Sequence, residues 1–262
     1  MMAVAILAAT QAAAQSPSNC TLPLLSGLYG MQRNGHNTSG TFTSSVGAVT
    51  FDGLGRFTGR ETVSTNGAFS KSQIDNGYTV NSDCTGTITD ASGTAIYKIA
   101  VAHDGEEAFG MSIVTGSTEA IHFERAFDDP GSDSPQCNAS SFRGTYLFQR
   151  NGRAGQSDLL AVGVLESDGR GTASASQTIG RNGVFTTPGV AVGTYTIEPD
   201  CIGAQYMNGV EFSKLVVVHD GGQILGISET PGNNVVIHFE RMSDPVSHLK
   251  RPPCDLRVDR RY

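Results

Sequence analysis

Hydrophobic and polar residues alternate along most of the chain, in short runs separated by Asp-Gly, Asn-Gly and Ser-Gly pairs. Alternation with a period of two is typical of half-buried β-strands, and these dipeptides suit tight hairpin turns. Nothing between the runs is long enough for a crossover helix, so neighbouring strands are expected to pair antiparallel. In the first half of the chain the pattern predicts strands at residues 27–33, 42–51, 56–64, 70–81, 85–90, 95–103, 107–114 and 119–125.

The second half of the chain repeats the first, with residues 20–125 returning as 137–241. A repeat of about 105 residues can bury its own core, whereas solenoid units are nearer 20 to 50 residues long. A meander of short strands with one apolar face loses both exposed edges when it closes on itself. We therefore predict an all-β protein made of two tandem eight-stranded antiparallel up-and-down β-barrels.

The repeat also sets the expected domain boundaries. The segment between the copies is polar and rich in turn residues, as in a linker. The opening residues form an apolar run like that of a secretory signal, and because no Lys or Arg precedes the run, the signal is expected to be incomplete. The expected units are a signal peptide at 1–14, barrel repeats at 20–126 and 137–242, a linker at 127–136 and a disordered basic tail at 243–262.

Alternation within the strands predicts which side chains face the barrel interior. In the last strand of the first copy, Arg125 shares the inner face with two apolar residues, whereas His122 and Glu124 point outward. In the strand before it, Phe109 and Met111 are predicted to point inward, like their counterparts in the second copy. The inward residues of the first strands are predicted to be Tyr29, Met31 and Arg33 in one copy and Tyr146, Phe148 and Arg150 in the other.

Composition and charge narrow the classes of function. The 262 residues include 32 Gly and no Trp, and only 16% are charged, which suits a turn-rich all-β chain. A net charge of −7 gives no electrostatic reason to bind nucleic acid or an anionic membrane surface. The apolar run at the start is shorter than the roughly 20 residues that span a bilayer, so we expect no membrane span.

The cysteines follow the repeat, because Cys20 and Cys84 recur as Cys137 and Cys201. An exported protein can keep disulfides, and duplication favours the pairing that each copy closes alone, Cys20 with Cys84 and Cys137 with Cys201. In a meander the start of the first strand and the end of the fourth lie at one end of the barrel, which agrees with this pairing. Cys254 has no counterpart and lies in the basic tail, where we favour a disordered terminus over an intermolecular link.

A Gly-x-aromatic segment begins the first strand of each copy, with Tyr29 and Tyr146 as the aromatics, and Arg125 and Arg241 end the last strands. This arrangement resembles the calycin pattern of lipocalins and avidins. The resemblance implies that each Arg packs over the aromatic of the first strand near the closed end of its barrel. In avidins Trp residues wall the biotin pocket, and this chain has none, so the resemblance does not extend to biotin binding.

Two further segments carry resemblances. Residues 46–59 look like the second and third strands of avidins. The pattern over residues 193–203 resembles uncharacterised exported bacterial proteins, which implies secretion but no activity.

Two histidine patterns occur once in each copy. His103 with Asp104 could form an acid/base pair, but the Gly that follows favours a hairpin turn. His122 and Glu124 leave the same face of one strand and could join a metal site or a contact between domains. Because a closed zinc site takes four ligands, we expect no metal and favour an exposed strand with polar pairs across neighbouring strands. A domain contact is the more plausible specific use.

The longest polar identity between the copies matches residues 32–35 with 149–152. The Asn-Gly within it could be no more than a tight turn without a binding role. An inward Arg near the open rim could instead bind a carboxylate. The candidate ligand-binding residues are Tyr29, Gln32, Arg33, Tyr146, Gln149 and Arg150.

The leading hypothesis is a secreted, periplasmic or extracellular protein without enzymatic activity or cofactor. It would bind a small hydrophobic or amphipathic ligand in its barrels. One alternative is an extracellular structural or interaction protein whose barrels are filled by side chains. Another is a barrel-fold enzyme of the isomerase or cyclase type, which would need a group such as His103 or Arg33 in a pocket.

Overall fold

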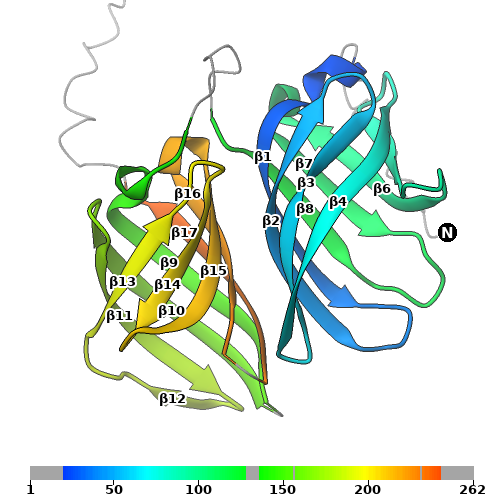
Figure 1. Cartoon of the computed structure of the whole chain (residues 1–262). Coiled ribbons are helices and arrows are strands. Elements are labelled where there is room, and N and C mark those ends of the chain that lie inside the picture. Colours follow the sequence, from blue (N-terminus) through cyan, green and yellow to red (C-terminus); the bar gives the residue numbers. More distant parts are fainter. Residues whose placement is uncertain (1–19, 128–135, 156, 231, 243–262) are drawn as a thin grey trace, which may run out of the picture.

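The computed structural model describes residues 20–127, 136–155, 157–230 and 232–242. Within them the chain forms two antiparallel β-barrels that lie side by side (Figure 1). The all-β prediction of two closed eight-stranded barrels is therefore confirmed. The expected signal peptide, the basic tail with Cys254 and most of the expected linker lie outside the described residues. No helix among the described residues is long and apolar enough to cross a membrane.

The first barrel is an uninterrupted meander in which each strand pairs with the next and β8 pairs with β1. Its strand positions follow the sequence pattern closely, because alternating runs and tight turns define both ends of most strands. The strands are β1 (Ser26–His36), β2 (Phe42–Asp52), β3 (Arg56–Thr65), β4 (Ala68–Val80), β5 (Thr85–Thr89), β6 (Ala95–Ala102), β7 (Glu107–Ser112) and β8 (Ala120–Arg125).

The second barrel repeats this order but contains one strand more. Its strands are β9 (Arg143–Ala154), β10 (Ser157–Asp168), β11 (Thr172–Arg181), β12 (Val184–Thr186), β13 (Ala191–Ile197), β14 (Ile202–Met207), β15 (Val210–Val218), β16 (Gln223–Ser228) and β17 (Asn233–Arg241). The counterpart of β4 is divided into β12 and β13 by a segment that contains Pro188, which has no N–H to donate to a β-ladder. Both pieces pair with β11, and the other eight strands close the barrel through the pairing of β10 with β11, without β12.

A short 3₁₀ segment and a disulfide close one end of each barrel. In the first barrel η1 (Leu22–Leu24) lies across the end, and the hydroxyl of Tyr78 donates to the carbonyl oxygen of Leu25 at 2.8 Å. The predicted pairing is present in both copies, as Cys20–Cys84 and Cys137–Cys201.

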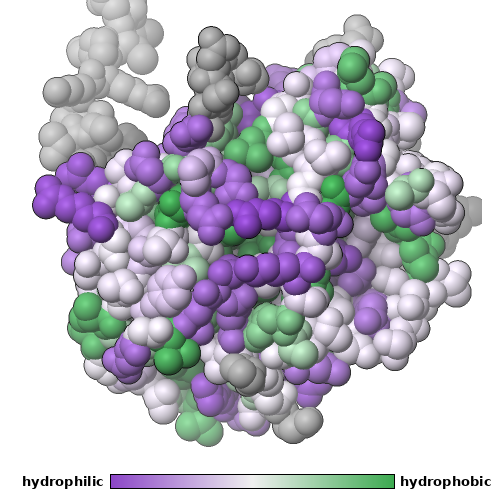
Figure 2. Space-filling view, viewed as in Figure 1, coloured by the Kyte–Doolittle hydropathy of each residue, from purple (hydrophilic) through white to green (hydrophobic). Residues whose placement is uncertain are grey.

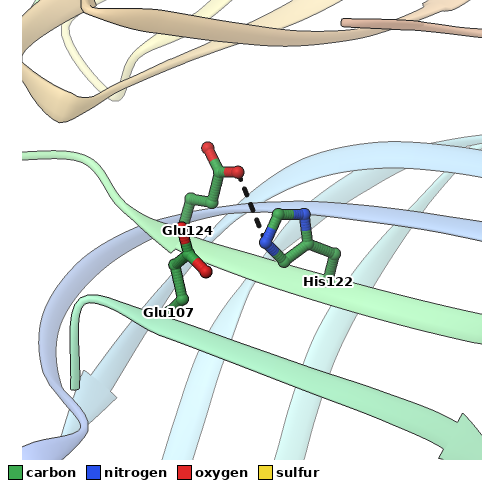
Figure 3. A group of neighbouring side chains, drawn as sticks. All are labelled: Glu107, His122 and Glu124. Atoms are coloured by element: carbon green, nitrogen blue, oxygen red, sulfur yellow. Dashed lines mark ion pairs between the residues drawn. The ribbon is translucent and has the colours of Figure 1, made fainter. Parts of the chain in front are cut away.

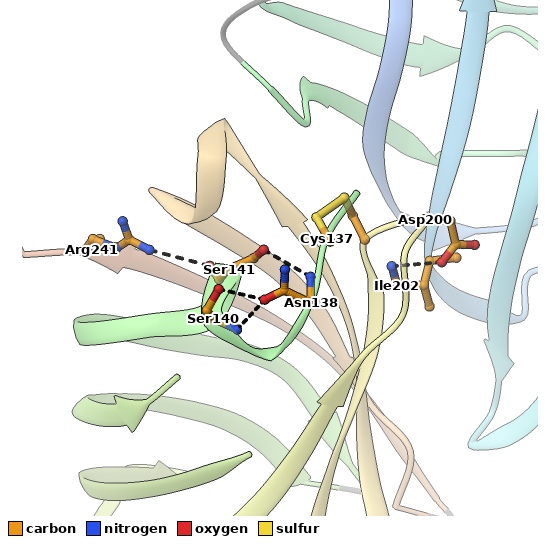
Figure 4. Close-up of a disulfide and its surroundings, with 8 residues drawn as sticks. Cys137, Asn138, Ser140, Ser141, Asp200, Ile202 and Arg241 are labelled. Carbon is orange, nitrogen blue, oxygen red and sulfur yellow. Dashed lines mark hydrogen bonds between the residues drawn. A yellow bond between two sulfur atoms is a disulfide. The ribbon is translucent and has the colours of Figure 1, made fainter. Parts of the chain in front are cut away.

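In the second barrel η3 (Ala139–Phe142) takes the place of η1, beside the disulfide of Cys137 (Figure 4). Asn138 caps it, because its side chain accepts a hydrogen bond from the Ser140 N–H at 2.9 Å. The hydroxyl of Ser141 in turn accepts one from the Asn138 N–H at 3.2 Å. This reciprocal cap holds the segment that closes the barrel end.

One assignment of inner and outer faces from the sequence is wrong. Phe109 and Met111 point outward and are 48% and 64% exposed, while Ala108 and Gly110 face the interior. A side chain at Gly110 would collide with Ile99 and Ile121, so the inner face of β7 carries small residues for steric reasons. The apolar residues of β7 therefore lie on the outside of the barrel. Their counterparts Leu225 and Ile227, also predicted to point inward, lie on the outer face of β16 and are buried in one cluster with Val46.

The two barrels pack tightly against each other. The outer faces of β1 and β2 contact the outer faces of β15 and β16, and β2 also contacts β17. Val46 and Ala48 of β2 belong to the same buried cluster as Val216 and Val218 of β15. Gly30 permits the close approach, because a Cβ there would lie 2.4 Å from Cγ1 of Val218. The centre of the interface is therefore an apolar extension of the second core.

Polar contacts surround this apolar centre. Gln32 Nε2 donates to the carbonyl oxygens of Gly226 and Ile237, at 2.9 and 3.2 Å. Arg60 forms ion pairs with Glu198 and Asp200 of the second barrel. On the face seen in Figure 2, hydrophilic residues lie over the seam between the barrels.

Candidate functional site

The interior of the first barrel is filled. Phe51 and Phe57 stack with ring centroids 4.6 Å apart, and Phe123 packs edge-on against both. The cavity left above them measures only about 70 Å³. This space is too small for a ligand, since ligand pockets usually measure at least about 300 Å³.

Carboxylates neutralise the predicted inward cation of the first barrel. Arg33 Nη2 lies 3.1 and 3.2 Å from the two carboxylate oxygens of Glu61. Its Nη1 lies 3.4 Å from the Tyr97 hydroxyl and 3.7 Å from Glu119. Burial lowers the pKa of Arg33, but the charge of Glu61 and the other partners outweigh it and raise the pKa above its usual value. Arg33 is thus held in a filled core and is not free for a ligand.

The second barrel contains a cavity of about 300 Å³ at the equivalent place. It exists because large side chains of the first barrel are replaced by small or polar ones in the second. The replacements of first-barrel residues by cavity-lining ones are Phe57 by Ala173, Ile74 by Ala191, Asn76 by Gly193 and Ile88 by Gln205. The apolar wall that remains includes Phe148, Leu165, Ile237 and Phe239.

Arg150, the counterpart of Arg33, lines this cavity, and no carboxylate is among the described residues that line it. Gln177 occupies the position of Glu61, and Val235 occupies that of Glu119. The Nε atom of Arg150 and the Oε1 atom of Gln177 are both buried and have no hydrogen-bond partner among the described residues. Burial, and secondarily the charge of Arg181, lowers the pKa of Arg150. The cavity therefore presents a buried donor and a buried acceptor.

The wall of the second barrel is interrupted beside the cavity. In the first barrel β3 pairs with β4 without a break. In the second barrel the equivalent strand β11 pairs with two short strands, β12 and β13. Val184 and Phe185 of β12 are largely exposed, and so are Val190, just before β13, and Val192 within it. Arg181 at the end of β11 lines the cavity and is itself exposed. The interrupted wall thus exposes apolar side chains, and Arg181 adds a cation to the cavity lining.

The tyrosines among the candidate residues lie at the closed ends, away from the cavity. The Tyr146 hydroxyl donates to the carbonyl oxygen of Gly221 at 2.8 Å, and Tyr29 bonds the equivalent Gly105. The guanidinium carbons of Arg125 and Arg241 lie 5.1 and 5.5 Å from the ring centroids of Tyr29 and Tyr146. Burial raises the pKa of Tyr29 to about 12, so it stays protonated. These residues stabilise the barrel ends.

The glutamines among the candidates point away from the barrel interiors. Gln32 donates across the interface, as described above, and Gln149 is exposed on β9. The His-Asp-Gly segments form the turns η2 (His103–Gly105) and η4 (His219–Gly221), with positive φ angles at the histidine and the aspartate in each. Of the six candidate ligand-binding residues, only Arg150 lies in a cavity of ligand size.

A second polar group lies on the outer face of the first barrel near the interface. Glu107, His122 and Glu124 point toward one another, with one ligand atom of each within 4.8 Å of the others (Figure 3). His122 Nε2 is 3.3 Å from Glu124, and His219 of the second barrel is 4.0 Å from the same carboxyl. Such donors can hold a divalent cation, although a closed zinc site takes four.

Burial governs the ionisation of this group. It raises the pKa of Glu124 to about 8, with help from the charges of Glu107 and Glu240. It lowers the pKa of His122 to about 4, with help from His238 and His219. At neutral pH the carboxyl is therefore protonated and the imidazole neutral. The outward pair serves as an uncharged part of the domain contact.

Sequence reasoning named Arg150 but missed the residues that make its surroundings. The signal lies in the differences between the two copies, Glu61 against Gln177 and Phe57 against Ala173, and not in their identities. A loss of charge and a loss of volume at adjacent inner positions together indicate an open, charged pocket.

No family model and no curated protein matches the chain. Among solved structures, kievitone hydratase from Nectria haematococca is 10% identical to this chain, with a TM-score of 0.30. The match covers 87% of this chain and 94% of the hydratase chain. A protein of unknown function of the DUF3598 family from Nostoc punctiforme is 11% identical with a TM-score of 0.26. That match covers 85% of this chain and 99% of the other. Likenesses at this level carry no argument about activity.

Proposed function

We propose that the second barrel binds one small amphipathic molecule with an anionic head group, and that the protein is a non-enzymatic ligand-binding protein. The observation that carries this proposal is Arg150, which has a buried Nε atom and faces a cavity of about 300 Å³ without a carboxylate partner among the described residues. A buried cation without a partner is costly, and a carboxylate or sulfonate supplied by a ligand would remove that cost.

The cavity also supports the amphipathic part of the proposal. Its lining combines apolar side chains with polar ones, so a ligand would bury an apolar body against Phe148 and Phe239 and place polar groups toward Arg150 and Gln177. The guanidinium can form two parallel hydrogen bonds with a planar carboxylate. Gln177 Oε1 would accept a hydrogen bond from a hydroxyl on the ligand.

The first barrel has a different role in this proposal. Its interior is filled and its Arg33 is neutralised, which fits the alternative of a filled structural barrel for this copy alone. Each chain therefore offers one ligand site, and the first barrel supports the second through their shared interface.

We also infer that the protein is exported. Two disulfides, each within one barrel, support an oxidising compartment such as the periplasm or the extracellular space. Mass spectrometry of the protein from its native host, with and without reduction, tests this inference. Free thiols at Cys20, Cys84, Cys137 and Cys201 in the isolated protein would refute it.

The binding test compares octanoate with octanol, which share a chain length and differ in charge. Isothermal titration of the whole protein is expected to give clearly tighter binding of octanoate. Arg150→Met should weaken octanoate roughly tenfold to a hundredfold, since a charge-assisted hydrogen bond contributes about 1.5–3 kcal/mol. The same variant should leave octanol binding nearly unchanged.

Two further variants complete the test. Arg170→Met removes a cation from an exposed turn of the same barrel and should leave octanoate binding unchanged. Ala173→Phe introduces the side chain found at the equivalent position of the first barrel and should abolish binding of both probes. The proposal fails if neither probe binds at millimolar concentration, or if octanoate affinity is insensitive to Arg150→Met.

A further inference from the structure

The contact between the barrels uses different faces of the two copies. We define the hairpin face as the outer side of β1–β2 and of its counterpart β9–β10, and the triple face as the outer side of β15–β16–β17 and of its counterpart β6–β7–β8. Within the chain, the hairpin face of the first barrel packs on the triple face of the second. The hairpin face of the second barrel and most of the triple face of the first stay unused.

Both unused faces expose apolar side chains at positions that are buried in the internal contact. On the hairpin face, Val46 is buried, whereas its counterpart Val162 is 57% exposed. On the triple face, Ile227 is buried, whereas its counterpart Met111 is 64% exposed. The other exposed members of the two unused faces are Leu147, Leu160, Ala100 and Phe109.

The side-chain volumes on the unused faces are exchanged relative to the internal contact. Internally, the small residue is Gly30 of the hairpin face, and the large residues that fill the space are Val216 and Val218 of the triple face. On the unused faces, the hairpin position of Gly30 holds Leu147. The triple positions of Val216 and Val218 hold Ala100 and Ala102. A large residue thus faces small ones in both arrangements, with the sides reversed.

The polar anchor of the internal contact is retained unchanged. Gln32 donates to the carbonyl oxygens of Gly226 and Ile237. Its counterpart Gln149 is exposed, and the counterparts of the two acceptors are again a glycine and an isoleucine, Gly110 and Ile121. The ion pairs at the border are not retained, because Ser176 stands where Arg60 does. The equivalent contact would therefore be similar at its centre and weaker at its edge.

We infer that the partner of these faces is a second copy of this chain. The hairpin face of the second barrel in one molecule docks on the triple face of the first barrel in the next. Leu147 then lies over Ala100 and Ala102, and Gln149 bonds the backbone of β7 and β8. Because the two faces differ, the contact is heterologous, and repetition produces a ring or a filament of chains.

Sedimentation velocity from 5 to 500 µM tests the inference on the whole protein. The wild type is expected to form species larger than a dimer as concentration rises. Leu147→Asp blocks one face and Met111→Lys blocks the other, so each variant alone should stay monomeric. An equimolar mixture of the two retains one matched pair of faces and should form a dimer that grows no further. Leu54→Asp, in an exposed turn, is the control and should associate like the wild type.

A second set of variants introduces no charged residue, so a loss of association in this set cannot come from a charge that disturbs folding. Ala100→Val alone should weaken association at least tenfold by colliding with Leu147. Adding Leu147→Gly should restore it, because the pair then matches Gly30 with Val216. A wild type that stays monomeric at 500 µM overturns the inference, as does a mixture of single-face variants that forms no dimer. Dimers formed by either variant alone would show a symmetric contact instead and would also overturn it.

Discussion

Replacing Glu124 by Gln should remove most of a pH dependence of stability that the buried carboxyl creates. The side chain is only 2% exposed, and burial raises its pKa to about 8 from an ordinary 4.5. Between these two values the folded protein keeps a proton that the unfolded chain has lost. The free energy of unfolding therefore falls with rising pH, by about 1.4 kcal/mol per pH unit for one proton.

His122 acts in the opposite direction over a lower range. Its pKa is lowered to about 4 from 6.5, so its contribution to stability is lost as the pH falls through that range. Between pH 4.5 and 6.5 the two groups largely cancel. Between pH 6.5 and 8 only Glu124 remains, and the unfolding free energy should fall by roughly 2 kcal/mol, about 30-fold in the folded-to-unfolded ratio.

Urea unfolding followed by far-ultraviolet circular dichroism at half-unit steps from pH 5 to 8.5 measures this profile. The difference between the wild type and Glu124→Gln is expected to change by roughly 2 kcal/mol between pH 6.5 and 8. Glu106→Gln removes a carboxylate from an exposed turn and should follow the wild-type profile. A difference between wild type and Glu124→Gln that stays constant across this window would refute the reasoning.

Three further predictions concern the cavity, the interface and the disulfide. Gln177→Glu should pair with Arg150 as Glu61 does with Arg33, raising the urea midpoint and lowering octanoate affinity at least tenfold. Gly30→Val should cost roughly 1–3 kcal/mol by overpacking, measured by urea unfolding, with partial recovery on adding Val218→Ala. Replacing Cys20 and Cys84 by Ser should cost about 4 kcal/mol, because the closed loop is long, measured as a lower urea midpoint.

Each of these predictions has a matched comparison. Gln177→Leu removes the amide without adding charge, so it should lack the stabilisation expected of the glutamate. Gly189→Val, in an exposed loop with open space around it and no positive φ, separates the steric effect at Gly30 from the loss of a glycine. Equal costs for both valines would contradict the account of the interface, and an unchanged urea midpoint on removing the disulfide would contradict the account of the closed barrel end.

The architecture could be predicted from the sequence because hairpin meanders are local. Alternation defines the strands, the Asp-Gly and Asn-Gly pairs define the turns, and duplication defines the number of barrels. The inversion at Phe109 and Met111 shows where this reasoning fails. Alternation assumes one polar and one apolar face, and β7 has glycine and alanine inside with large apolar residues outside.

The site could be predicted only in part. Arg150 was recognisable as an inward cation. That it lacks a carboxylate partner depends on Gln177 and Val235, which replace two glutamates and come from other strands. The division of β4 into two strands in the second copy could not be placed from hydropathy, although Pro188 marks it. The volume of a cavity depends on several side chains that face one another from different strands. It therefore cannot be predicted from any single position of the sequence.

The position of β16 in the second barrel has a consequence for how a guest molecule comes and goes. In the closed sheet, β11 lies four strands from β16 in either direction, so the interrupted wall is diametrically opposite the wall that joins the other barrel. We therefore expect a ligand of the proposed kind to enter and leave on the side remote from the joint. Its binding should then leave the relative orientation of the two barrels unchanged.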